Sequence, residues 1–203
     1  MSDCFESEKP FYKLTYFYTK KTEYCMNTLA IIEKYYKKDS DLYNILVQHS
    51  TDVTNKALSI ATNHPELNID SKFVSEAGML HDIGIFMTNA PSIKCFGIEP
   101  YVAHGYLGRV IVENAGYPVH ALVCERHTGT GISLEEIIEN NMPVPHRDMR
   151  PVSIEEKLIC FADCFFSKTR LGEERPIDKV RQSLSKFGEA SVRQFDRWCA
   201  IFL

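Results

Sequence analysis

Polar side chains occur at positions where helical spacing calls for apolar ones. His49 lies within the apolar stripe of one helical pattern, the pair His81 and Asp82 ends a second apolar run, and Asp163 lies inside a third. An isolated buried carboxylate is costly, so it normally pairs with a cation or binds a metal. Buried aspartates beside buried histidines therefore predict a metal site.

Two further histidines, His104 and His127, occur at the start and at the end of predicted helices. The six candidate ligands are His49, His81, Asp82, His104, His127 and Asp163. Imidazole nitrogen and carboxylate oxygen suit Fe, Mn, Zn, Co or Ni, and the lack of thiolates argues against a structural zinc. Six ligands exceed what one metal with an open position uses. They suffice for two metals with Asp82 as the bridge.

A single histidine is more often a core or capping residue than a ligand, so only convergence of the whole set supports this hypothesis. His64, His120 and His146 are not assigned to the site, although His146 lies in a proline-containing loop that could reach it.

Helices joined by short loops must position these residues, since sustained apolar–polar alternation and hairpin turn signals are absent from the sequence. Cap and breaker residues predict the helix ends. The predicted helices cover residues 23–37, 41–63, 70–82, 100–116, 118–127, a short segment after 133, 153–169, and 177–201 with a point of interruption at 188. Residues 141–152 are predicted to form an ordered loop.

The 203 residues carry a net charge of −4, and no uncharged apolar stretch is long enough to span a membrane. The charge balance argues against a nucleic-acid coat or a basic membrane anchor. Asp3, Glu6 and Glu8 stand where a signal peptide needs positive charge, so we expect a cytoplasmic protein. Seven scattered cysteines favour neither a disulfide framework nor a cysteine zinc site. The aromatic first 20 residues suggest an arm that packs on the body or on the partner chain of a homodimer.

The run His81-Asp82-Ile83-Gly84 is the signature of the HDIG subgroup of the HD-domain superfamily, and the ordered histidine and aspartate set resembles its binuclear branch. The resemblance covers about residues 39–170. Residues 127–129 and 156–163 are similar to bacterial symmetrical dinucleoside-tetraphosphate hydrolases. The resemblance implies an all-α fold, an HD-domain helical bundle, with an N-terminal extension and helix over residues 1–38 and the HD domain over residues 39–203.

The resemblance also implies a metal-dependent phosphohydrolase. Two divalent metals (Fe, Mn, Ni, Co, Zn or Mg) would activate a water that attacks a phosphate ester or anhydride of a nucleotide or other small phosphorylated molecule. His49, His81 and Asp163 would hold one metal and His104 and His127 the other, with Asp82 bridging them.

One departure from the family concerns the phosphate contact. Many catalytic relatives have Lys or Arg soon after the His-Asp-x-Gly motif, where this chain has Ile85. The missing cation must then come from elsewhere in the chain, and Arg170 is the preferred candidate. The other candidates are Arg126, Lys168 and Arg109.

Two other functions stay open at this point. Some HD-fold proteins with a similar ligand set carry a mixed-valent di-iron pair that activates oxygen, and the missing cation makes that alternative harder to dismiss. A non-catalytic module that binds a nucleotide is the other. In each case we expect a small-molecule ligand, with no nucleic-acid polymer and no membrane as partner.

Overall fold

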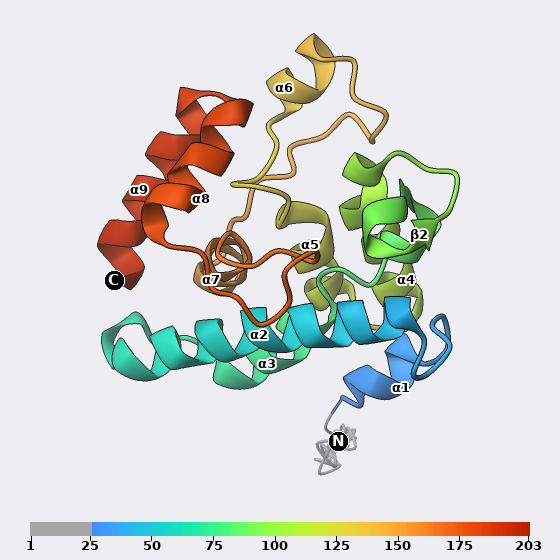
Figure 1. The fold of residues 1–203 in the computed structure, drawn as a ribbon. Coiled ribbons are helices and arrows are strands. Elements are labelled where there is room, and N and C mark those ends of the chain that lie inside the picture. Colours follow the sequence, from blue (N-terminus) through green and yellow to red (C-terminus); the bar gives the residue numbers. More distant parts are fainter. Residues whose placement is uncertain (1–25) are drawn as a thin grey trace, which may run out of the picture.

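The structure, a computed structural model, describes residues 26–203, which form a bundle of α-helices (Figure 1). The α-helices of this part of the chain are α1 (Thr28–Ile32), α2 (Asp41–Asn63), α3 (Ser71–Leu80), α4 (His104–Asn114), α5 (Pro118–Arg126), α6 (Leu134–Glu139), α7 (Ile154–Asp163), α8 (Ile177–Leu184) and α9 (Glu189–Phe202). The only strands among the described residues are β1 (Asn89–Ala90) and β2 (Cys95–Phe96), which pair antiparallel. The predicted all-α fold is confirmed.

Helix α7 lies at the centre of the bundle. It contacts α2, α3 and α5 on its several sides, and α9 packs against it as well. Its residues Leu158–Ala162 are fully buried, so this helix is apolar around its whole circumference, as a core helix must be. Long helix α2 lies beside α3, while α8 and α9 form a hairpin on the side of α7 away from α4 (Figure 1). The last residue of α7, Asp163, is thereby held in the middle of the molecule.

Side-chain caps stand at the starts of α2, α3, α6 and α7. Ser40 accepts a hydrogen bond from the Tyr43 amide at the start of α2, and Asp70 accepts one from the Phe73 amide at the start of α3. Ser133 and Glu136 form both halves of a capping box on α6. Ser153 caps α7, but Glu156 binds the Val152 amide instead of completing a box.

Helix α7 ends at Asp163, whereas the sequence pattern predicts that it continues to residue 169. Nη2 of Arg175 donates to the carbonyl oxygens of Cys164 and Phe166, and the Arg175 amide donates to that of Phe165. These carbonyls would accept the next helical hydrogen bonds, so Arg175 satisfies them from outside. The chain after Asp163 is therefore free to turn toward the centre of the bundle.

The first helix is also shorter than predicted. It spans Thr28–Ile32, and the chain then turns so that buried Tyr36 donates its hydroxyl hydrogen to the carbonyl of Ile83. Helix α3 stops at Leu80 rather than at residue 82, because the imidazole of His81 binds the carbonyl of Gly78. Residues 23–25 and the aromatic N-terminal arm lie outside the described residues, and the domain division at residue 38 stays a prediction.

Within residues 26–203, no helix is both long enough and apolar enough to cross a membrane. The cysteines of this part of the chain, at positions 95, 124, 160, 164 and 199, are free thiols. The structure thus shows no disulfide framework among the described residues.

Candidate metal centre

Five segments bring the six predicted ligands together. His49 comes from the middle of α2, His81 and Asp82 follow the end of α3, His104 begins α4, His127 follows α5, and Asp163 ends α7. Their nitrogen and oxygen atoms form two groups in which all atoms lie within 4.8 Å of one another. The first group is His49, His81, Asp82 and Asp163, and the second is Asp82, His104 and His127.

Asp82 belongs to both groups because each of its oxygens faces a different pair of imidazoles. Its Oδ2 lies 3.1 Å from Nε2 of His49 and 3.1 Å from Nε2 of His81. Its Oδ1 lies 3.4 Å from Nε2 of His104 and 3.4 Å from Nε2 of His127. A carboxylate in this position can bind two cations at once, one through each oxygen.

The backbone sets the ring orientation of three histidines. Nδ1 of His81 donates to the carbonyl of Gly78 at 2.6 Å. Nδ1 of His104 and of His127 make the same contact with the carbonyl of the residue three positions earlier, at 2.6 Å and 2.7 Å. A carbonyl oxygen only accepts, so each Nδ1 carries a proton. Nε2 of each ring therefore faces the cluster, and in the neutral imidazole this nitrogen carries the lone pair that a metal would bind, which is the orientation of metal-ligating histidines.

Within the described part of the chain, several buried polar atoms of the cluster have no hydrogen-bond partner or face only other members of the cluster and Lys168. Nδ1 of His49 makes no hydrogen bond there. Nε2 of His49 lies 2.9 Å from Oδ1 of Asp163, and the nearest imidazole nitrogens to Oδ1 of Asp82 are 3.4 Å away. In addition, Nε2 of His104 lies 3.1 Å from Nε2 of His127, so two lone pairs face each other. Buried polar groups without partners are rare and costly. A divalent cation among these atoms satisfies them, and the donor set of imidazole and carboxylate therefore fits such an ion.

Burial and neighbouring charge act together on the ionisable groups. Burial lowers the pKa of His81, but Asp82 and Asp163 outweigh it and raise that pKa to about 10. Burial, with His127 close by, lowers the pKa of His104 to about 3. Burial raises the pKa of both aspartates, yet Lys168 and the histidines hold these pKa values well below the usual range. The two carboxylates are thus ionised, as metal ligands must be.

Gly84 allows α4 to approach the segment that carries His81 and Asp82. A Cβ atom at Gly84 would lie 2.2 Å from the carbonyl oxygen of His104 and 2.5 Å from the amide nitrogen of Gly108. No side chain fits there. The glycine of the His-Asp-Ile-Gly run therefore allows His104 to lie within reach of Asp82.

Of the four candidate cations, Lys168 is the one that lies in the cluster. Its Nζ lies 2.6 Å from Oδ2 of Asp82, and its side chain is 11% exposed. Burial lowers the pKa of Lys168, but Asp82 outweighs this and holds it well above its usual range. The ammonium group also lies 6.0 Å from the centre of the Tyr101 ring.

The three predicted arginines lie elsewhere. Arg126 binds both carboxylate oxygens of Glu156 at 3.1 Å, and Arg109 binds Glu125 at 2.5 Å. Arg170 is exposed and lies outside the lining of the cavity described below. The preferred cation of the sequence interpretation is thus not brought to the cluster, whereas Lys168 is.

The histidines left unassigned also lie away from the cluster. His64 pairs with Glu66, and His120 pairs with Glu76. His146 is exposed and does not line the cavity.

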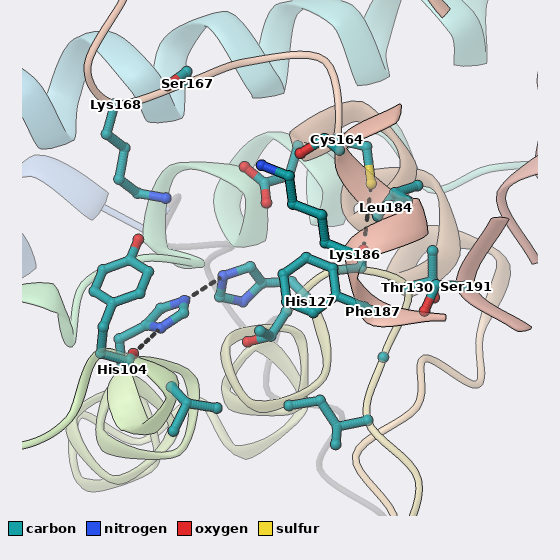
Figure 2. Close-up of a pocket in the computed structure, with 18 of the residues that line it drawn as sticks. His104, His127, Thr130, Cys164, Ser167, Lys168, Leu184, Lys186, Phe187 and Ser191 are labelled. Carbon is teal, nitrogen blue, oxygen red and sulfur yellow. Dashed lines mark hydrogen bonds between the residues drawn. The ribbon is translucent and has the colours of Figure 1, made fainter. Parts of the chain in front are cut away.

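A cavity of 670 Å³ lies against the cluster. His104, His127, Asp163 and Lys168 line its inner part. Figure 2 shows His104 and His127 with their rings facing each other at this place. The loop of residues 128–132 and α6 supply one wall, and α8 with the turn after it supplies another. The volume lies within the range typical of small-molecule sites.

Tyr101, Lys186 and Phe187 are among the residues of this cavity that sequence reasoning missed. Tyr101 precedes His104 by one turn, a spacing that could have indicated it. Lys186 and Phe187 come just before Gly188, which was recognised only as a helix break. Their position depends on how the α8–α9 hairpin packs, for which the sequence holds no local signal.

Comparison with known proteins also singles out the part of the chain that carries the cluster. The family model described as "HD domain" matches residues 46–166, which include all six clustered residues. The uncharacterized protein MJ0778 of Methanocaldococcus jannaschii is 34% identical over 145 residues, which are 70% of this chain and 78% of that protein. The tRNA (cytidine(56)-2'-O)-methyltransferase of Picrophilus torridus is 29% identical over 135 residues, or 66% of this chain.

The chain spans only 35% of the length of the Picrophilus protein. No solved structure gives a significant match to the chain. The family match covers more than half of the chain, and it coincides with the helices that carry the histidine and aspartate cluster. The chain belongs to the HD domain family.

Proposed function

We propose that this protein is a metal-dependent phosphohydrolase. Its substrate is a phosphate ester or anhydride of a nucleotide or of another small phosphorylated molecule. The observation that carries the proposal is the position of Asp82. This carboxylate is shared between two groups of imidazoles and lies beside the ammonium group of Lys168, next to an open cavity.

His49, His81 and Asp163 would hold one divalent ion, and His104 and His127 would hold a second. Asp82 would bridge the two. The ligand types accept Fe, Mn, Ni, Co, Zn or Mg. When bound, such ions lower the pKa of a water molecule and neutralise the charge of phosphoryl oxygens.

The side chains around the cluster have distinct tasks in this reaction. Lys168, which Asp82 holds in place, attracts an anionic group to the inner part of the cavity, and this makes the lysine the first candidate for the phosphate contact. The oxygen of a water molecule bonds to phosphorus, the bond from phosphorus to the leaving oxygen breaks, and protons released by the water are taken up by the leaving group and solvent. The carbonyls of Gly78, Tyr101 and Cys124 keep the imidazoles oriented throughout.

Two observations support hydrolysis over the alternatives. A cation inside the cavity suits a phosphate, which an oxygen-activating site does not require. Two segments are similar to dinucleoside-tetraphosphate hydrolases. Residues 127–129 line the cavity, and residues 156–163 end at Asp163, which also lines it. A binding module alone has no need for six converging ligands.

A phosphate-release screen tests the proposal. Protein stripped with a chelator is reloaded with each of the six metals and incubated with nucleotides, a dinucleoside tetraphosphate and sugar phosphates. Turnover is measured as inorganic phosphate, and for the dinucleoside tetraphosphate, whose symmetrical hydrolysis yields two nucleoside diphosphates, as nucleotide product by chromatography. We expect turnover with at least one metal, and loss of turnover in Asp82→Ala. Asp148→Ala, which removes an exposed carboxylate paired with Arg150, is the matched control and should keep full activity.

The same samples distinguish the other two functions. Oxygen consumption by the iron-loaded protein, without phosphate release, would replace the hydrolase proposal with an oxygenase. Nucleotide binding without any turnover would replace it with a binding module.

A further inference from the structure

The outer wall of the cavity comes from a part of the chain beyond the HD family match. That match ends at residue 166, whereas α8 and the 3-10 turn after it, Ser185–Phe187, lie further along the chain. Val180, Leu184, Lys186 and Phe187 of this segment all line the cavity. The inner part of the cavity is therefore built by the family core and this wall by the C-terminal hairpin.

Phe187 is a large apolar side chain that the fold does not bury. It is 67% exposed although it lines the cavity. The hairpin is held to the core by other aromatic residues, since Phe195, Trp198 and Phe202 of α9 are buried. Gly188, at a φ of 99°, reverses the chain just after Phe187. The ring of Phe187 is thus presented to the cavity without a role in packing the core.

Lys186 adds a positive charge beside this ring. Among residues 26–203 it has no ion-pair partner, in contrast to Lys168, which pairs with Asp82. In Figure 2 the two lysines extend into the cavity from different segments, and Phe187 lies on the side of Lys186 and His127. An ammonium group and an open aromatic face next to each other suit a ligand that has both an anionic group and a flat ring.

We infer that the substrate is a nucleoside phosphate whose base stacks on Phe187 and whose phosphate chain lies between Lys186 and the histidine cluster. This inference rests on the proposed hydrolase function and deepens it. Phe187 is a specificity-determining residue, because the base is the part of the substrate that it contacts. Lys186 neutralises the charge of the phosphate chain, so it contributes to binding of every ligand that has such a chain. The cavity of 670 Å³ has room for such a ligand.

Two probes separate these contacts in a binding experiment. The first is α,β-methylene-ADP, and the second is methylenediphosphonate, which has the same P–C–P unit but no nucleoside. Calorimetric titration of the Mn²⁺-loaded protein with each probe gives affinities that do not depend on turnover. Stacking of a base on an aromatic side chain accounts for about tenfold or more in affinity.

We expect Phe187→Ala to weaken binding of α,β-methylene-ADP about tenfold and to leave binding of methylenediphosphonate unchanged. Lys186→Gln should weaken both probes by a similar factor. Phe96→Ala is the matched control for an exposed phenylalanine outside the cavity lining, and Lys179→Gln is the control for an exposed lysine of the same hairpin. Both controls should bind as the unchanged protein does.

The inference is overturned if Phe187→Ala binds both probes as the unchanged protein does, if it weakens both equally, or if the unchanged protein does not bind α,β-methylene-ADP. Failure of the hydrolase proposal has a different signature. In that case no metal supports phosphate release, while the contrast between the two probes in Phe187→Ala persists. If Phe187→Ala released phosphate from nucleotides with an unchanged KM, this inference would be wrong and the hydrolase proposal would stand.

Discussion

The ammonium group of Lys168 lies 2.6 Å from Oδ2 of Asp82, the carboxylate that both imidazole groups share. Lys168 reaches this position because α7 ends at Asp163 and the chain turns inward. The pair joins a residue of the loop after α7 to the His-Asp run after α3. A positive charge is thereby fixed beside the place where a phosphate would react.

Substitution Lys168→Met removes the charge and keeps an unbranched side chain that is shorter by the terminal nitrogen alone. We expect kcat for phosphate release to fall by about 10²–10³-fold, the usual cost of losing one group that stabilises transition-state charge. Metal content, measured by mass spectrometry, should not fall. Lys34→Met, an exposed lysine outside the cavity, is the control. Equal rates in Lys168→Met and Lys34→Met would exclude a role for Lys168 in the reaction.

Metal removal should lower the thermal stability of the protein. An ion that binds only the native state at about 100 times its Kd adds about 2.7 kcal/mol to the free energy of unfolding. For a chain of this size that is a rise of about 5–10 °C in Tm. Tm of the chelator-treated protein should therefore rise on addition of metal. Asp82→Asn, which removes the shared charge, should show a much smaller rise, and an equal rise would place the ion elsewhere.

A clamp of two arginines holds the buried carboxylate of Glu125, whose side chain is 1% exposed. Arg109 binds its Oε2 at 2.5 Å, and Nε of Arg147 binds its Oε1 at 2.8 Å. Removal of both arginines leaves an unpaired buried charge, so we expect Arg109→Ala with Arg147→Ala to cost about 3–5 kcal/mol in urea unfolding. Each single variant should cost less than half of this, since the other arginine remains.

Arg150→Ala breaks an exposed pair with Asp148 and is the control for this clamp, with an expected cost below about 1 kcal/mol. A double variant no less stable than Arg150→Ala would show that water reaches Glu125.

The thiols of Cys160 and Cys164 should resist alkylation in the native protein. Burial raises the pKa of both, and the thiolate is the reactive form. Cys199, which is only partly buried, should react before Cys160 and Cys164 with iodoacetamide at pH 8. Peptide mass spectrometry reports each site separately, and labelling in urea gives the reference in which all three react. Labelling of Cys164 as fast as Cys199 in the native state would contradict the packing of α7.

The sequence allowed prediction of the cluster because its residues follow the helical pattern. His49 stands in an apolar stripe, and Asp163 ends an apolar run, so both positions can be read from spacing of 3.6 residues per turn. The cations could not be predicted in the same way. Helical spacing favours Arg170 only if α7 continues past Asp163, but Arg175 donates hydrogen bonds to the carbonyls that would extend the helix. That contact depends on the tertiary structure, so it cannot be predicted from the spacing of residues along the chain.

The cavity wall was unpredictable for a related reason. Lys186 and Phe187 are separated by about 20 residues from Asp163, and their approach to the cluster depends on the packing of α8 and α9 on α7. Phe187 is exposed, although phenylalanine is a residue type that sequence patterns usually assign to the core. Only the structure distinguishes it from the buried Phe195 and Phe202 on the next helix.

His81, His104 and His127 each anchor their ring to a carbonyl of their own helical turn, three residues back. The orientation of each ring is therefore fixed by the local backbone rather than by contacts between distant segments. An arriving ion has little side-chain entropy to remove from these donors, so more of the interaction free energy remains for affinity. Such preorganisation would also disfavour ions that require ligands at other distances from these three ring nitrogens.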